Sequence, residues 1–253
     1  MDITVVGSGT VVPRLRRRQS CVTVRTGEET LVFDLGSGAV RGMLRAGLDP
    51  FAVDRIFFTH FHPDHMVDVV PLLFSIKYGA EEARTRPLYL TGPMQFGDLW
   101  NSLTNLWGEF MVGDYPTQIS ELPHECPSPL DLPGCNLSWA PARHRPESIA
   151  YRLDGEGGAF VYTGDTEYTE SVVELAGGAH TLLIECSFPD HTPVEGHLTP
   201  CGVARIASEA DVERVVLTHI YPAADELDLA SEVGRGGYTG EIVVAEDGLW
   251  FEM

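Results

Sequence analysis

The sequence predicts an α/β fold in which two β-sheets are covered by helices. Apolar, strand-like runs recur along all 253 residues, and helix-compatible stretches lie between some of them. Strands come first and then alternate with helices, which is typical of layered α/β proteins. Ionisable residues directly follow several strand-like runs, and α/β sheets place their functional sites at such strand ends. We expect residues 1–253 to form a single domain.

The predicted strands are short runs rich in β-branched and aromatic residues. They are ITVVGSGT at 3–10, CVTVRT at 21–26, TLVFDLGSG at 30–38, RIFFTH at 55–60, PLYLTG at 87–92, NLSWAPARH at 136–144, AFVYTGD at 159–165, TLLIEC at 181–186, RVVLTH at 214–219 and EIVVAEDGLWF at 241–251. Apolar residues at helical spacing predict helices over 66–78, 95–110, 170–176 and 200–210.

Two of these strands repeat one pattern. Residues 55–60 and 214–219 both read Arg, three apolar residues, Thr and His. Two further strands lead to a carboxylate, at Asp165 and Glu185. The repeat indicates two similar halves whose strand ends meet along one edge, where the polar side chains would form a site.

The segment HFHPDH is the strongest indication of chemistry in the chain. Imidazoles and carboxylates are the ligands that zinc and other divalent transition metals prefer. In an extended backbone His60 and His62 lie on the same side, so both can bind one ion. Pro63 keeps His62 extended, and beyond the turn Asp64 and His65 can reach a second position. A polar turn that caps a following helix would explain one of these polar residues, but not all of them.

Three further ligand candidates occupy strand ends. His144, Asp165 and His219 each follow a strand-like run. Each alone has an ordinary explanation, since a lone histidine is often a satisfied polar residue and Gly-Asp-Thr is a common turn. Together they complete a predicted set of ligands for two divalent metal ions: His60, His62, Asp64, His65, His144, Asp165 and His219.

This set resembles the metallo-β-lactamase superfamily, and the resemblance covers nearly the whole chain. The segments GSGTVVP, LVFDLGSG and VVAEDGLWF are also similar to that family's frame. The resemblance implies an αββα sandwich with a dinuclear site at its edge, holding Zn²⁺ or, alternatively, Mn²⁺ or Fe²⁺. It further implies that one ion is bound by His60, His62 and His144, that the other is bound by Asp64, His65 and His219, and that Asp165 bridges them.

Within the superfamily, the chain is most similar to the branch of ribonuclease Z and related phosphodiesterases. The segments LYLTGP, LLIECSFPD, EGHLTPCGVARIA and VVLTHIYP carry this similarity. It implies that Glu185 and His197 form a catalytic pair, in which His197 donates a proton to the leaving oxygen and Glu185 fixes its tautomer. Asp64 would orient the attacking water. An alternative for His197 is a structural role at the start of the helix at 200–210. Asp34 is a candidate hydrogen-bond partner for a ligand histidine.

The sequence also departs from that branch. Its tRNA-processing members have a long basic arm between the third histidine and the bridging aspartate, whereas here a short stretch with the turn LDGEGG joins His144 to Asp165. Ile184 stands where the family has a histidine, and an arginine–tyrosine pair after the last ligand strand is missing. The net charge of −20 repels polyanions. We therefore expect a small or nucleotide-type phosphodiester as substrate rather than tRNA.

Other interpretations stay open. Authentic tRNA 3′-processing is one alternative. Hydrolysis of an aryl sulfate, a lactone or a thioester, and iron-dependent oxygenation, are others, because the histidine–aspartate motif does not separate them. A non-enzymatic module with a structural metal predicts closed coordination, whereas the ligand set named above leaves room for water.

The remaining features concern location and thiols. The N-terminus has no basic and apolar segment of the signal-peptide type, and the chain has no run of roughly 18 apolar residues, so we expect a cytoplasmic protein that does not enter the membrane. Five cysteines without a CxxC pair predict reduced thiols. Cys126 and Cys135 belong to a proline-rich segment that we expect to be a surface loop, with a third metal site as the alternative.

Two features concern partners. The arginines between Arg14 and Arg18 predict a solvated hairpin loop, with a phosphate-steering loop as the alternative. Residues 66–110 carry aromatic residues and leucines at helical spacing, which we interpret as core or as the interface of a homodimer, the assembly that the family resemblance implies. The walls of a substrate pocket are the alternative interpretation.

Overall fold

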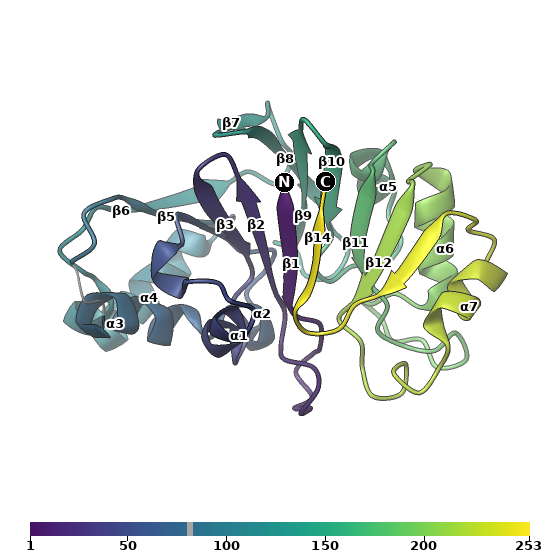
Figure 1. Cartoon of the computed structure of the whole chain (residues 1–253), viewed down its shortest axis with the longest axis horizontal. Coiled ribbons are helices and arrows are strands. Elements are labelled where there is room, and N and C mark those ends of the chain that lie inside the picture. The colour runs from purple at the N-terminus through teal and green to yellow at the C-terminus, as the bar shows by residue number, and fades with distance from the viewer. Residues whose placement is uncertain (80–82) are drawn as a thin grey trace.

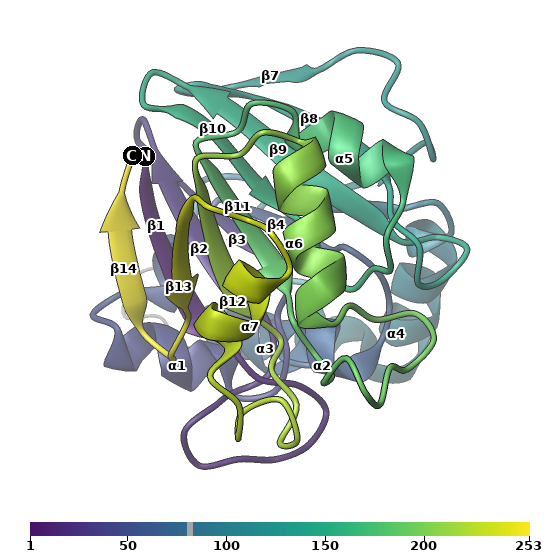
Figure 2. The same ribbon diagram turned by 90° about the vertical axis from the view of Figure 1, so that its right-hand side faces the viewer.

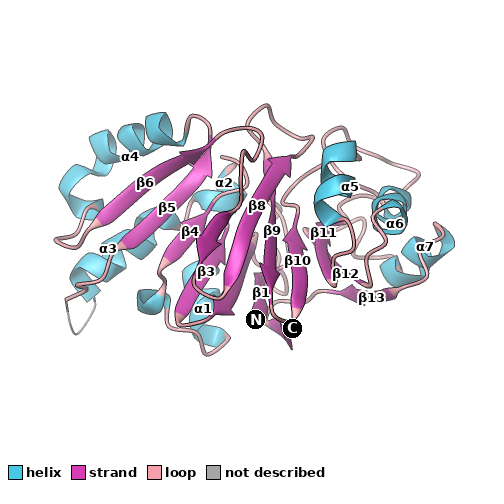
Figure 3. Cartoon of the chain, turned by 90° about the horizontal axis from the view of Figure 1, so that it is seen from above, coloured by secondary structure: helices cyan, strands magenta, loops and turns pink. Residues whose placement is uncertain are grey.

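The computed structural model describes residues 1–79 and 83–253. Within these residues, two seven-stranded sheets pack face to face, and helices cover the outer face of each sheet (Figure 1). The same four layers are seen from above in Figure 3. The predicted αββα sandwich is therefore confirmed.

The first sheet has the strand order β14-β1-β2-β3-β4-β5-β6. Its strands β14, β1, β2 and β3 pair antiparallel, whereas β3 to β6 pair parallel. The strands are β1 Asp2–Gly7, β2 Cys21–Thr26, β3 Glu29–Phe33, β4 Arg55–Phe57, β5 Leu88–Pro93, β6 Thr117–Leu122 and β14 Leu249–Glu252. The covering helices are α1 Ala39–Arg45, α2 Pro63–Met66, α3 Val69–Gly79 and α4 Phe96–Met111.

The second sheet has the strand order β13-β12-β11-β10-β9-β8-β7. Its strands β7 to β10 pair antiparallel, and β10 to β13 pair parallel. The strands are β7 Leu130–Leu132, β8 Cys135–Pro141, β9 Ile149–Gly155, β10 Gly158–Tyr162, β11 Thr181–Glu185, β12 Arg214–Thr218 and β13 Glu241–Val244. The covering helices are α5 Glu170–Ala176, α6 Pro200–Glu209 and α7 Leu229–Arg235, as Figure 2 shows.

The central strands are apolar on both faces because each sheet is covered on both sides. In β3, Phe33 packs between the two sheets, whereas Val32 packs against the helices of its own sheet. In β12, Val216 packs between the sheets, whereas Val215 and Leu217 face α5 to α7. Successive side chains of a strand point to opposite faces, so a continuous apolar run is what such a strand requires.

Some elements differ from the prediction. The run EIVVAEDGLWF forms two strands in different sheets, because the chain turns at Gly248, whose φ of 90° favours glycine. The helix predicted over 66–78 corresponds to α3, which begins at Val69, whereas Met66 ends the separate short helix α2. Strands β6, β7 and β9 have no predicted counterpart. Strands β6 and β7 lie at sheet edges and are largely exposed, so their sequences lack an apolar run, whereas β9 is mostly buried and its short apolar run is interrupted by Arg152. Helices α1 and α7 also have no predicted counterpart.

The arginine run lies in the loop that joins the antiparallel strands β1 and β2, as the hairpin-loop prediction has it, and Arg14 and Arg16 are exposed, but the run is not solvated throughout. Arg17 is buried, bonds the carbonyl of Ala245 and forms an ion pair of 2.7 Å with Asp225. Arg14 reaches the same carboxylate at 3.2 Å, and Arg18 lies 3.6 Å from Asp247. Carboxylates from the C-terminal quarter of the chain therefore hold the run in place. The local sequence does not reveal these contacts.

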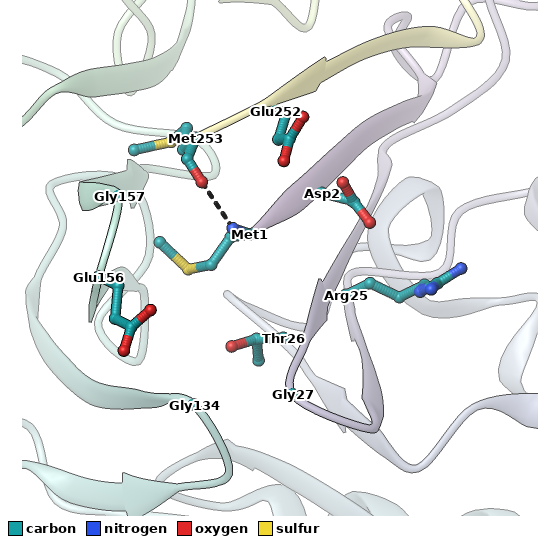
Figure 4. Close-up of a pocket in the computed structure, with 10 residues that line it drawn as sticks. All are labelled: Met1, Asp2, Arg25, Thr26, Gly27, Gly134, Glu156, Gly157, Glu252 and Met253. Carbon is teal, nitrogen blue, oxygen red and sulfur yellow. Dashed lines mark hydrogen bonds between the residues drawn. The ribbon is translucent and has the colours of Figure 1, made fainter.

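The two termini lie side by side on β1 and β14, at the end of the sandwich away from α2 (Figure 1). The amino group of Met1 donates to the carbonyl of Met253 at 2.7 Å. A cavity of about 620 Å³ opens beside them, with acidic residues, Arg25 and glycines in its lining (Figure 4). It contains none of the predicted site residues. In the described part of the chain, no helix has the length and apolar character needed to span a bilayer.

Candidate metal centre

The predicted site residues meet at one edge of the sandwich, beside α2. They follow the carboxyl ends of β4 in the first sheet and of β8, β10 and β12 in the second, and Glu185 ends β11. Because β10, β11 and β12 are parallel, their carboxyl ends share one edge. The residues that converge there are His60, His62, Asp64, His65, His144, Asp165, Glu185, His197 and His219.

The turn after β4 brings four of these side chains together. His62 is extended, with φ −63° and ψ 143°, and Pro63 begins the short helix α2. A proline at the first helical position loses no backbone hydrogen bond, since that N–H has no partner within the helix. The helical turn then directs Asp64 and His65 inward, where both are buried.

Asp165 lies between two groups of side chains and directs one carboxylate oxygen towards each. Its Oδ2 is 3.9 Å from Nε2 of His60 and 3.8 Å from Nε2 of His144. Its Oδ1 is 3.2 Å from Nε2 of His65 and 3.4 Å from Nε2 of His219. A carboxylate in this position can contact two ions at once.

The first group consists of His60, His62 and His144 with Asp165. Nδ1 of His62 lies 3.1 Å from Nε2 of His144. The possible ligand atoms of all four residues lie within 4.8 Å of one another. This spacing suits a single ion.

The second group consists of Asp64, His65 and His219. Their possible ligand atoms also lie within 4.8 Å of one another, and Nε2 of His219 is 3.6 Å from Oδ2 of Asp64. His219 has a left-handed backbone with φ 51°, which is unusual for a residue other than glycine. The strain indicates that the surrounding contacts, among them the bond from Ser187 Oγ to the His219 carbonyl at 2.8 Å, determine its position.

Four of the histidines are held at the ring nitrogen that faces away from the cluster. A partner at Nδ1 fixes the tautomer and directs Nε2 to the centre, as is usual for histidines that bind metals. The Nδ1 contacts are 3.0 Å to Thr59 Oγ1 for His60, 2.7 Å to Asp34 Oδ2 for His65, 2.8 Å to Gly196 O for His144 and 3.0 Å to Ser187 Oγ for His219.

Of these partners, Asp34 is the one that the sequence indicates. It is fully buried, and its carboxylate also accepts from the amide of Thr59 at 2.8 Å and from the hydroxyl of Tyr162 at 2.9 Å. Thr59 has a weak signal, since a threonine precedes the histidine in both repeated strands. Ser187 and Gly196 have no signal that spacing could reveal, because their contacts depend on how distant loops fold together.

Three buried polar atoms in this cluster have no hydrogen bond. They are Nε2 of His60, Nε2 of His219 and Oδ1 of Asp165. Unsatisfied polar atoms are rare in protein interiors and usually indicate a missing ion or water. Imidazoles and carboxylates are suitable ligands for zinc and related ions, so these histidines and aspartates are positioned to bind metal.

The electrostatics of the cluster agree with that role. Burial and the neighbouring imidazole of His65 hold the pKa of His60 well below its usual range, so His60 is neutral and able to bind a metal. Burial raises the pKa of Asp165, but His219 and His65 outweigh it and hold the pKa well below the usual range. Burial lowers the pKa of His65, but Asp165 and Asp34 hold it well above its usual range.

Glu185 and His197 form a contact at the rim of the cluster. Nδ1 of His197 lies 3.1 Å from Oε2 of Glu185, which is fully buried and also accepts from the amides of Thr166 at 2.6 Å and Leu198 at 3.2 Å. His197 lies in the loop before α6, with its ring directed to Glu185. Burial lowers the pKa of His197, but the hydrogen bond and charge of Glu185 outweigh it and raise the pKa.

An apolar groove of about 450 Å³ adjoins the cluster between α2, α3 and α4. Phe61 and Pro63, which flank His62 in the sequence, line it together with Trp107. Helix α4 also exposes 70% of Leu106 and 40% of Trp107 to solvent. Residues 66–110 thus contribute both core and an exposed apolar face.

The second cysteine of the proline-rich segment is not in a loop. Cys135 begins β8 and is buried, and Cys126 packs at the edge of the core between the sheets. In residues 1–79 and 83–253, neither belongs to a group of three possible metal ligands.

Comparison with known proteins agrees with this description. The family model of the beta-lactamase superfamily domain matches residues 31–220. Ribonuclease Z of Haloarcula marismortui is 30% identical over 306 aligned positions, which cover 98% of this chain and 96% of that protein. The probable metallo-hydrolase YhfI of Bacillus subtilis is 26% identical over 258 positions, which cover 100% of both chains.

Two solved structures have the same fold. The crystal structure of YhfI superposes with a TM-score of 0.83 at 23% identity and covers 99% of this chain and 98% of its own. The short form of human tRNase Z superposes with a TM-score of 0.80 at 22% identity and covers 100% of this chain and 99% of its own.

Proposed function

This chain belongs to the metallo-β-lactamase superfamily, in its ribonuclease Z-like branch, and from that premise we propose that it is a metal-dependent phosphodiesterase acting on a small or nucleotide-type substrate. The observation that carries the proposal is the position of Asp165, whose two carboxylate oxygens face separate groups of ligand atoms. This arrangement fits two divalent ions.

We assign His60, His62 and His144 to one ion, Asp64, His65 and His219 to the other, and Asp165 to both. The imidazole-rich set favours Zn²⁺, with Mn²⁺ and Fe²⁺ as alternatives. When bound, such ions would lower the pKa of a coordinated water and stabilise negative charge on the phosphoryl oxygens.

The residues of the chain supply the remaining steps. Asp64 orients the attacking water and accepts its proton. His197 donates a proton to the leaving oxygen: Glu185 holds Nδ1, which leaves Nε2 for donation, and raises the pKa of the ring, which favours its protonated form. A phosphodiester with a basic alkoxide leaving group needs such an acid, which supports this substrate class over thioesters and aryl sulfates, whose leaving groups are weaker bases.

Two observations support a substrate smaller than tRNA. The alignment with ribonuclease Z needs 306 positions for a chain of 253 residues, so that enzyme has residues with no counterpart here, whereas YhfI aligns over 258 positions. The net charge of −20 also opposes the approach of a polyanion. The identity to ribonuclease Z nevertheless supports tRNA 3′-processing as the second candidate function.

The test is a substrate panel on protein of known metal content. Bis(p-nitrophenyl) phosphate, cyclic nucleotides and pre-tRNA are compared with an aryl sulfate, a lactone and a thioester. We expect phosphodiester hydrolysis that a chelator abolishes and Zn²⁺ or Mn²⁺ restores. Cleavage of pre-tRNA in preference to small esters would establish the second candidate, and hydrolysis of another ester class alone would refute the proposal.

We also propose a homodimer that packs through the exposed face of α3 and α4. The face contains Phe74, Leu106, Trp107 and Phe110, each at least 40% exposed. Helices α3 and α4 contact each other, and exposed apolar residues gathered on neighbouring helices are the kind of surface that proteins use for interaction. The cytoplasmic location stays a prediction from the sequence.

A further inference from the structure

His144 differs from the other ligand candidates in how its ring is held. Its Nδ1 lies 2.8 Å from the backbone carbonyl of Gly196, in the loop that carries His197. A carbonyl only accepts hydrogen bonds, so Nδ1 carries the proton and Nε2 is free to face His62 and Asp165. The orientation of His144 therefore depends on where this loop lies.

Gly196 is in turn held by Glu167. The amide of Gly196 donates to Oε1 of Glu167 at 2.7 Å. Gly196 has φ 86°, and a Cβ at this position would lie 2.8 Å from Nδ1 of His144. The close approach of backbone to ring thus requires glycine, and the carboxylate of Glu167 keeps the peptide in place.

Glu167 is itself anchored beside His144. Its amide donates to the carbonyl of Arg143 at 2.8 Å, and its Oε2 lies 2.9 Å from Nε of Arg143. Glu167 also follows Asp165 closely in the sequence, with Thr166 between them bonded to Glu185. One short segment therefore contacts both the metal cluster and the loop of His197.

We propose that Glu167 is a positioning residue, which through Gly196 fixes the tautomer and orientation of His144 and places His197 beside the metal site. The inference rests on the metal site of the proposed function, but not on the substrate. If Glu167 has this role, loss of its acceptor atom has two joint effects. One of the two metal equivalents binds more weakly, and proton donation by His197 is impaired.

The experiment compares Glu167→Ala with Glu167→Gln. Zn²⁺ affinity is measured by competition with a chromophoric chelator, and kcat and KM are measured on esters with good and poor leaving groups. In Glu167→Ala we expect one Zn²⁺ equivalent to bind about 10- to 100-fold more weakly, the range typical for partners of ligand residues. We expect kcat to fall most for the poor leaving group, with KM little changed.

Glu167→Gln separates the hydrogen bond from the charge. Its amide oxygen can still accept from Gly196, and Arg143, with a side chain 72% exposed, can turn into solvent. We therefore expect rescue of the Zn²⁺ affinity. Equal losses in the two variants would mean that charge alone matters and would overturn the proposal.

Two further variants complete the test. Glu195→Ala removes an exposed carboxylate from the same loop and should leave Zn²⁺ affinity unchanged. Gly196→Ala should weaken binding of the same Zn²⁺ equivalent as Glu167→Ala, and circular dichroism confirms that the variant is folded. Unchanged Zn²⁺ affinity in either Gly196→Ala or Glu167→Ala would overturn the proposal. If the wild type binds Zn²⁺ but hydrolyses no phosphodiester, the proposed function fails, whereas the affinity comparison still decides the role of Glu167.

Discussion

Oδ2 of Asp34 lies 2.7 Å from Nδ1 of His65, and both side chains are fully buried. Asp34 is in the turn after β3, and His65 is in α2, so this contact joins the turn to the helix that carries two ligand candidates. The carboxylate keeps Nε2 of His65 directed to Asp165 and increases the basicity of the ring.

Asp34→Asn should weaken metal binding. The amide oxygen of asparagine still accepts hydrogen bonds, but the side chain has one acceptor atom in place of two and loses the negative charge that supports the His65 ring. We expect about 10- to 100-fold weaker binding of one Zn²⁺ equivalent, measured by chelator competition. Asp54→Asn is the matched control, since Asp54 is also buried but lies before β4, away from the cluster. Equal losses of affinity in both variants would contradict the role of Asp34.

Asp165→Ala should remove both metal equivalents, whereas Asp64→Ala should remove one. The reason is geometric: Asp165 faces both groups of ligand atoms, and Asp64 belongs to one. Elemental analysis after gel filtration of Zn²⁺-loaded protein measures the number of zinc ions per chain. Asp154→Ala, which removes an exposed carboxylate on β9, should retain both ions. Retention of one ion in Asp165→Ala would argue against a bridging position.

Metal binding should release a proton from His65. Asp165 and Asp34 hold the pKa of His65 well above its usual range, which favours a protonated ring in metal-free protein. Because a ligand nitrogen must be deprotonated, affinity should rise with pH, by about tenfold per unit, until the pH passes that pKa. Calorimetry of Zn²⁺ binding in two buffers of different ionisation enthalpy counts the protons released. Proton release that does not change with pH would contradict this prediction.

Glu185→Gln should shift the pH profile of kcat. His197 donates only when it is protonated, so activity is lost as pH rises through its pKa, which Glu185 raises. Without that charge, burial lowers the pKa, and the alkaline limb of kcat moves to lower pH. The shift should be large for a methyl or nucleoside leaving group and small for 4-nitrophenolate, which needs no acid. An unchanged limb for poor leaving groups would exclude His197 as the donor.

His197→Ala should leave the metal content intact, because its ring nitrogen is engaged by Glu185 rather than by the two ligand groups. We expect kcat on esters with poor leaving groups to fall about 10²- to 10⁴-fold, the usual contribution of a general acid. Elemental analysis and kinetics on the same preparation check both statements. Loss of metal in this variant would instead make His197 a ligand, in the group that it forms with Asp165 and His219.

Leu106→Glu should dissociate the dimer. A charge on the exposed apolar face of α4 opposes burial of that face against a second copy. Light scattering coupled to gel filtration measures the mass. Leu15→Glu is the control, since Leu15 is an exposed leucine like Leu106 but lies on the arginine loop, and the substitution should leave the mass unchanged. A wild type that is monomeric at high concentration would refute the dimer itself.

The convergence of the ligand candidates at one edge could be predicted from the sequence because these residues have strong local signals. Four of them are packed into HFHPDH, and the others follow apolar strands whose ends must share an edge. The layered fold follows from the same runs, since strands covered on both faces are apolar throughout. These features depend on residues close in sequence or on periodicity.

The contacts that orient the ligands could not be predicted in the same way. The bond from His144 to Gly196 and the bond from Ser187 to His219 join loops far apart in the chain, and any of several polar residues could have filled those places. Arg17 likewise looks solvated in a basic run, yet it is buried because Asp225 lies opposite. Such pairings follow from tertiary structure alone.

The pairing of β14 with β1 joins the last strand of the chain to the first. During synthesis on a ribosome, every ligand candidate up to His219 emerges before residues 249–252, which complete the first sheet. Until then β1 presents an unpaired edge to the cell, where it can recruit a foreign strand. A chain that already contains its ligand candidates would thus still have an open sheet edge, and removal of residues 249–252 should promote aggregation through β1.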